Sequence, residues 1–193
     1  FKENFYQRLA FDEIFSTFLV NSEIRKKIKK IKKTKKKFDI KKQGEIISKL
    51  DFSLTNDQTK TLNEINKDLC SDNKMFRLLQ GDVGSGKTIV ALLSAFNTIS
   101  SDFQVAVMAP TEILARQHFL LAKKIFPKII KIELLSGKSS YKDKKKILNK
   151  LIKKEIDIIF GTHALFQKKV EFKKLGLIII DEQHKFGVNQ RKR

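Results

Sequence analysis

Two groups of residues in this chain have the types and spacing needed to handle a nucleotide. The first is the segment Gly81-Asp82-Val83-Gly84-Ser85-Gly86-Lys87-Thr88, which fits the pattern G-x-x-x-x-G-K-[ST]. In this pattern, main-chain N–H groups surround phosphate oxygens, the lysine reaches the β- and γ-phosphates, and the last hydroxyl ligates Mg²⁺. We therefore predict ATP and Mg²⁺ as cofactors, bound by Gly81, Asp82, Gly84, Ser85, Gly86, Lys87 and Thr88.

The second group is a pair of carboxylates, Asp181 and Glu182, which follows the apolar run Leu177-Ile178-Ile179-Ile180. A carboxylate at the tip of a parallel strand faces the ligand-binding edge of its sheet. Asp181 is predicted to bind Mg²⁺ there together with Thr88. Glu182 is predicted to orient and deprotonate the attacking water, while Lys87 supports the same reaction.

Short apolar runs and helical patterns alternate through the second half of the chain. The expected strands are 75–80, 104–109, 131–135, 156–160 and 177–180, and the expected helices between them are 88–100, 112–125 and 142–153. Such alternation predicts an α/β fold with a parallel sheet between helices. The all-apolar run 177–180 is the pattern of a strand buried on both faces.

A further helix is expected just after Leu54, where Thr55 and Gln58 have the spacing of a capping box. Upstream, apolar residues at spacings of three and four predict a helix over 4–31. Its end runs into a lysine-rich stretch from Arg25 to Lys37, which either binds a polyanion or is a solvated, frayed helix followed by a linker near 38–43.

Composition adds a charge argument. The 193 residues include 41 Lys and Arg against 21 Asp and Glu, a formal net charge of +20. So large a surplus favours nucleic acid as a partner. The alternative is that an AT-rich genome has enriched the protein in lysine, without any function for the charge. The single cysteine, Cys70, excludes an internal disulfide and favours a cytoplasmic location. No apolar stretch approaches the roughly 18 residues of a membrane span.

The two ends lead to an expectation about completeness. The chain begins with Phe1 rather than Met, in what reads as the middle of a helix, and it stops at Arg193 without a closing element. We expect a fragment of a longer protein.

The string Asp181-Glu182-Gln183-His184, after an apolar strand and downstream of a phosphate loop, resembles the DExH group of superfamily 2 helicases. The blocks Ala109–Ala115 and Gly161–Leu165 resemble motifs Ia and Ic of that group, and Leu54–Gln58 resembles its adenine-reading glutamine block. The longer strings Leu78–Thr88 and Asp181–Val188 resemble the RecG family of bacterial branch-migrating DNA helicases.

This resemblance implies further roles. Gln58 would read adenine, and Gln183 and His184 would couple the nucleotide state to DNA. A track for DNA would be lined by Pro110, Thr111, Gly161, Thr162 and His163. The implied partner is branched DNA at forks and Holliday junctions, without a membrane and with the protein as a monomer.

The implied fold is a RecA-like P-loop NTPase domain with a helical extension before it. Residues 1–50 would link to a missing wedge domain, and 51–193 would form the first motor domain, truncated before the motif III strand. Because a second motor domain supplies arginines to the site, the fragment alone is expected to be nearly inactive. A transcription-repair coupling translocase and a non-catalytic basic nucleic-acid-binding module are the alternatives.

Overall fold

The computed structural model describes residues 33–137, 140–166 (the main chain only at 166) and 170–181, together with residues 8, 11–12, 14–16, 18–20 and 22–23. The chain divides into two compact units. One consists of Phe1–Lys36 and Lys67–Gln80, and the other of Lys37–Asn66 and Gly81–Arg193.

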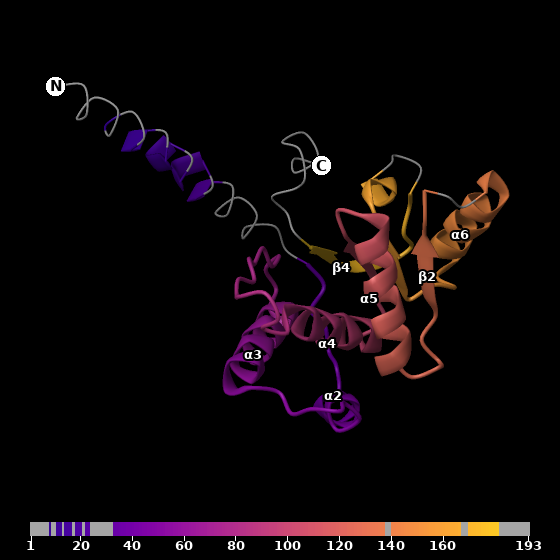
Figure 1. Cartoon of the computed structure of the whole chain (residues 1–193), viewed down its shortest axis with the longest axis horizontal. Coiled ribbons are helices and arrows are strands. Elements are labelled where there is room, and N and C mark those ends of the chain that lie inside the picture. The colour runs from indigo at the N-terminus through magenta and orange to yellow at the C-terminus, as the bar shows by residue number, and fades with distance from the viewer. Residues whose placement is uncertain are drawn as a thin grey trace. The chain divides into compact units, whose positions relative to one another are not determined.

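The larger unit is built on a parallel four-stranded sheet in the order β2-β3-β1-β4 (Figure 1). Its strands are β1 (Gln104–Met108), β2 (Ile132–Leu135), β3 (Ile158–Gly161) and β4 (Leu175–Ile180). Each of these strands was expected from its apolar run, with bounds that differ by at most two residues. The parallel α/β fold is confirmed.

Helices cover both faces of this sheet. On one face, Leu151 of α6 (Tyr141–Lys153) packs with Ala106 and Ile159 in an apolar cluster. On the other, Phe119 of α5 (Glu112–Ile125) meets the ring of Phe160 edge-on. Helix α4 (Lys87–Ser100) packs against β1 and β4, and most of its residues from 89 to 98 are buried. The buried strands and α4 form the core of the unit.

Helices α3 and α2 come before α4 in the sequence. Helix α3 (Asn56–Cys70) begins in the larger unit and ends in the smaller one. Helix α2 (Ile40–Ile47) is capped by Asp39, whose carboxylate accepts a hydrogen bond from the Lys41 N–H over 2.9 Å. A linker was expected near 38–43, and that expectation was wrong. Burial of Ile46 stabilises the helix against α4.

Two expectations about strands were also wrong. Residues 75–80 form no strand, because a strand needs hydrogen-bonding neighbours and the sheet contains β1 to β4 alone within the described residues. Strand β4 is not buried on both faces, since Ile178 is 50% exposed and Ile180 39% exposed. It lies at the edge of the sheet, where β1 is its neighbour on one side.

The smaller unit contains the described helical residues between 8 and 23, which agree with the helix expected over 4–31, and the end of α3. The Lys33 ammonium donates to the main-chain oxygens of Asp68 and Leu69, over 2.7 and 3.2 Å. These bonds cap the last carbonyls of α3. Burial, followed by the nearby charge of Lys33, lowers the pKa of Lys36 to about 8. Residues 24–32 of the lysine run lie outside the described part.

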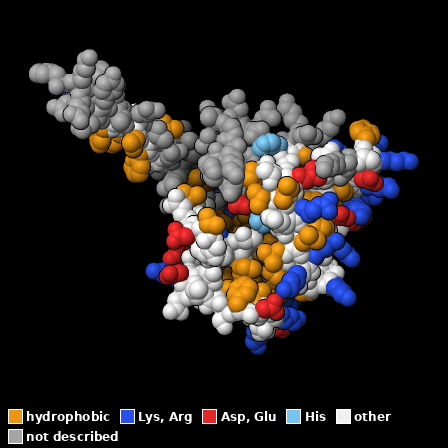
Figure 2. Space-filling model, viewed as in Figure 1, with side chains coloured by type: hydrophobic (Ala, Val, Ile, Leu, Met, Phe, Trp, Pro, Cys, Tyr) orange, Lys and Arg blue, Asp and Glu red, His pale blue; other side chains and the backbone are white. Residues whose placement is uncertain are grey.

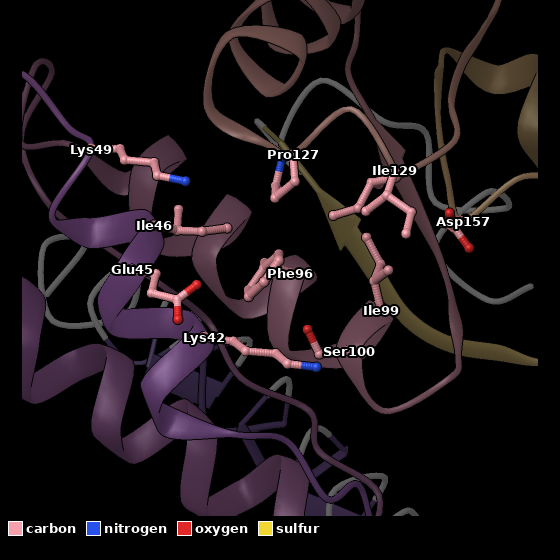
Figure 3. Close-up of a pocket in the computed structure, with 11 residues that line it drawn as sticks. Lys42, Glu45, Ile46, Lys49, Phe96, Ile99, Ser100, Pro127, Ile129 and Asp157 are labelled. Carbon is pink, nitrogen blue, oxygen red and sulfur yellow. The ribbon is translucent and has the colours of Figure 1, made fainter.

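A pocket of about 360 Å³ lies between α2, the end of α4 and the loop after α5 (Figure 3). Its floor is apolar, with Ile46, Phe96 and Ile130, and Lys42 and Asp157 stand among its polar residues. None of the predicted site residues lines this pocket. Within the described residues, no helix is both long enough and apolar enough to span a membrane.

Candidate functional site

The loop that enters α4 has the backbone its sequence requires. Gly84 and Gly86 have φ of 83° and 78°, in the left-handed region that residues with a Cβ adopt only at a cost. Gly86 is also the N-cap of α4, and no side chain caps the helix there. The positive end of α4 is therefore directed at the loop, as expected for a phosphate site.

Lys87 closes this loop from inside. Its ammonium donates to the main-chain oxygens of Gly81 and Asp82, both over 2.7 Å. Thr88 follows in the first turn of α4 and is partly buried. The lysine and the hydroxyl thus lie at the entrance to the helix, where the sequence pattern needs them.

Gln58 reaches this loop from the first turn of α3. Its side-chain amide donates to the Ser85 main-chain oxygen over 2.9 Å. Its side-chain oxygen accepts from the Thr55 N–H over 2.9 Å, while the Gln58 N–H donates to the Thr55 hydroxyl over 3.2 Å. The capping box is confirmed. The contact with Ser85 was not predicted, because nothing local in the sequence relates the two residues.

The carboxyl ends of the four strands lie side by side. Register pairs Leu135 with Gly161, Gly161 with Met108, and Met108 with Ile180 in one row across the sheet. The residues that follow this row include Thr162 after β3 and Asp181 after β4. The Asp181 N–H donates to the Met108 oxygen over 2.8 Å, which extends the main-chain pairing of β4 with β1 to Asp181.

The residues expected along a DNA track gather at this same edge. Thr111 is the N-cap of α5, and its hydroxyl accepts from the Leu114 N–H over 3.3 Å. Gly161 ends β3, where its oxygen accepts from the Ala109 N–H over 3.0 Å. Pro110 lies between β1 and α5, Thr162 follows β3, and exposed His163 opens the short helix η1 (His163–Phe166). The fold therefore brings the two blocks together, although they are about 50 residues apart in sequence.

The Asp181 carboxylate has a partner that was not predicted. Its Oδ2 lies 2.8 Å from Nε2 of His118, on α5. The sequence patterns assigned no role to His118. Its spacing of three and four from the apolar residues Ala115 and Ala122 could have placed it on the packed face of α5. Glu182, Gln183 and His184, which complete the predicted catalytic string, lie outside the described residues.

The loop and the carboxylate belong to elements that touch, since α4 packs on β4. Figure 2 shows lysine and arginine side chains gathered over α5, β2 and α6. The arrangement has the parts of a nucleotide site, with a glycine loop, a lysine, a hydroxyl and a carboxylate, beside a sheet edge lined by threonines and a histidine.

Residues 55–193 match a family model described as DEAD/DEAH box helicase. The ATP-dependent DNA helicase RecG of Thermotoga maritima is 47% identical over 186 residues, which cover 96% of this chain and 24% of the relative. RecG of Aquifex aeolicus is 46% identical over 197 residues, covering 100% of this chain and 24% of the relative.

Solved structures agree with these relatives. A structure of RecG bound to a three-way DNA junction superposes with a TM-score of 0.84 at 45% identity, covering 94% of this chain and 25% of that one. The UvsW helicase of bacteriophage T4 has a TM-score of 0.58 at 19% identity, which shows a shared fold alone. The chain spans about a quarter of the length of the RecG proteins it matches.

Proposed function

The chain belongs to the DEAD/DEAH box helicase family, and from that membership we propose that it forms the ATP-binding motor domain of a RecG-type ATP-dependent DNA helicase. The observation that carries the proposal is the loop Gly81–Thr88, with Lys87 at its centre and Gln58 hydrogen-bonded to its edge. Identity of 42 to 47% over most of this chain to relatives named RecG favours that branch over a transcription-repair coupling translocase.

In this function, the loop binds the phosphates of ATP. The left-handed glycines direct main-chain N–H groups inward, and the uncapped start of α4 adds the positive end of the helix dipole. The Lys87 ammonium, which donates to two main-chain oxygens of the loop, would hold the phosphates when ATP is bound. Gln58, whose side-chain amide contacts the Ser85 carbonyl of this loop, is proposed to read the base.

The residues also fit Mg²⁺. Hydroxyl and carboxylate oxygens are the ligands that Mg²⁺ prefers, and Thr88 and Asp181 supply one of each. The metal, when bound, neutralises charge that develops on the phosphates. Glu182 would take the proton of the attacking water. Gln183 and His184 would couple the nucleotide state to DNA.

DNA is proposed to lie along the carboxyl edge of the sheet. Pro110, Thr111, Gly161, Thr162 and His163 line this edge, and hydroxyls and main-chain groups of this kind bind phosphates without reading sequence. A partner of this type also fits the net charge of +20. The whole protein is proposed to move on branched DNA at forks and junctions, as a monomer in the bacterial cytoplasm.

The test is a Lys87→Ala variant of the full-length protein, with DNA-stimulated ATP turnover and binding to a three-way junction measured side by side. We expect turnover to fall by about 10²-fold or more, the usual effect of removing one positioned donor. Junction binding should stay within a few-fold of its original affinity. Lys145→Ala, which alters an exposed lysine on α6, is the matched control. Turnover that survives in the Lys87→Ala protein overturns the proposal.

A further inference from the structure

His118 and Asp181 form a close polar contact between α5 and the tip of β4. Nε2 of the histidine lies 2.8 Å from Oδ2 of the carboxylate, and the two residues are 63 positions apart in sequence. The His118 side chain is 12% exposed and that of Asp181 35% exposed. Water is thus largely excluded from the histidine, which strengthens a hydrogen bond to a charged group.

The chemistry of the contact fixes which atom donates. An ionised carboxylate only accepts, so Nε2 of His118 carries the proton that lies between the two groups. The imidazole thereby engages one carboxylate oxygen, Oδ2, at the point where β4 ends.

The helix holds the imidazole in place. Ala115 is 1% exposed and Ala122 is 0% exposed, and both lie three or four residues from His118 on one face of α5. Thr111 fixes the start of the helix through its cap. An apolar side chain would fill such a packed position equally well, whereas histidine adds a donor aimed at the carboxylate.

We propose that His118 is a positioning residue for metal binding. By donating to Oδ2, it fixes the orientation of the Asp181 carboxylate, the residue proposed above to bind Mg²⁺. This role deepens the function proposed above and rests on Asp181 being a metal ligand. Groups that hydrogen-bond to a metal-binding side chain typically change metal affinity or activity by 10- to 100-fold when they are removed.

The test compares three substitutions in the full-length protein. His118→Leu keeps bulk and removes the donor. His118→Gln places an amide N–H near the position of Nε2, and His118→Asn has a shorter amide that stops near Nδ1. Gln117→Leu, at the exposed neighbouring position on α5, is the control. Folding of each variant is checked by circular dichroism.

Two quantities are measured for each protein. The first is the affinity for Mn²⁺, used in place of Mg²⁺, in an electron paramagnetic resonance titration with a non-hydrolysable ATP analogue. The second is the Mg²⁺ concentration that half-activates ATP turnover. We expect the Leu and Asn variants to weaken Mn²⁺ binding by about 10- to 100-fold. The Gln variant should recover to within a few-fold of the original protein.

Unchanged Mn²⁺ affinity in the Leu or Asn variant overturns the proposal, and so does a Gln variant as weak as the Asn variant. Where the Leu variant fails to fold, the Gln and Asn pair decides alone. Asp181→Asn separates the two levels of inference. If Asp181→Asn leaves Mn²⁺ affinity unchanged, the metal role of Asp181 fails. If it abolishes binding while the His118 variants have no effect, only the role of His118 fails.

Discussion

The side-chain amide of Gln58 donates to the main-chain oxygen of Ser85 over 2.9 Å, and this bond joins the first turn of α3 to the phosphate loop. The Oε1 atom of the same amide accepts from the Thr55 N–H. One side chain therefore closes the start of a helix and holds the wall of the proposed nucleotide site.

A Gln58→Glu substitution separates these two tasks. Glutamate still accepts from the Thr55 N–H, so the capping box remains. It cannot donate to Ser85, and it turns a carboxylate oxygen toward a carbonyl. We expect ATP binding, followed with a fluorescent analogue, to weaken by about 5- to 20-fold, the equivalent of roughly 1–2 kcal/mol for a lost hydrogen bond.

Gln58→Ala is the companion variant, because it removes both bonds. Its free energy of unfolding should fall below that of Gln58→Glu by about 1 kcal/mol, the usual value of a cap. Equal ATP affinity for Gln58→Glu and the original protein would contradict the role assigned to the Ser85 contact.

Two glycines of the loop offer a matched comparison. Gly84 and Gly86 both have positive φ, but a Cβ at Gly84 would meet nothing within 4 Å, whereas one at Gly86 would clash with Nε2 of Gln58. Gly84→Ala should cost about 1–2 kcal/mol of unfolding free energy for the backbone alone. Gly86→Ala should cost about 1 kcal/mol more, because Gln58 has to leave Ser85.

The extra cost can be assigned by repeating both glycine substitutions in the Gln58→Ala background. There the difference between Gly86→Ala and Gly84→Ala should vanish, as measured by urea unfolding. A difference that persists without the glutamine side chain refutes the clash as its cause.

Gln104 is a buried amide that ties three segments together. Its Nε2 donates to the oxygens of Leu151 and Ile156, and its Oε1 accepts from the Lys174 N–H, all within 3.0 Å. Gln104→Leu removes the partner of all three main-chain groups, and should cost roughly 2–5 kcal/mol of unfolding free energy. The exposed Gln117→Leu should stay within about 0.5 kcal/mol of the original protein. Similar stability of the two leucine variants would contradict the prediction.

Lys36 gives the smaller unit a pH dependence. Burial lowers the pKa of Lys36 to about 8, against 10.5 as its ordinary value. Between these two values, the unfolded chain binds more protons than the folded one, so stability rises as pH rises through this window. Below pH 8, the folded state bears the full cost of charging a buried lysine.

Lys36→Met removes that cost at every pH. Relative to the original protein, the variant should gain the most stability at pH 7 and progressively less at pH 9 and 10. Urea unfolding at these three pH values measures the gap. A gap that stays constant from pH 7 to pH 10 would show that Lys36 does not titrate in this window.

Local patterns in the sequence were sufficient for much of this structure. The bounds of α5 were predicted as found, because Thr111 caps an amphipathic stretch that ends at Phe126 and Pro127. The capping box of Thr55 and Gln58 is equally local. Asp39 is also an N-cap, at the start of α2, yet α2 was missed because the lysines around it suggested a linker.

Features that depend on distant neighbours could not be predicted in this way. Whether the apolar run ending at Ile180 is buried depends on what lies beside β4, and the sequence of the strand contains no information about that. The contact between His118 and Asp181 depends on how α5 lies on the sheet. The roles of Glu182, Gln183 and His184 stay predictions, as does the domain boundary at residue 50.

Helix α5 carries Thr111 at its beginning and His118 two turns further on, a separation of roughly 10 Å along its axis at 1.5 Å per residue. An unbroken helix of this length behaves as a stiff rod, so its two contacts shift in concert. A displacement of the threonine end of α5 would therefore be accompanied by a displacement of the imidazole that contacts the Asp181 carboxylate. A single stiff helix thus connects the proposed DNA-binding edge at Thr111 mechanically with the proposed metal ligand Asp181.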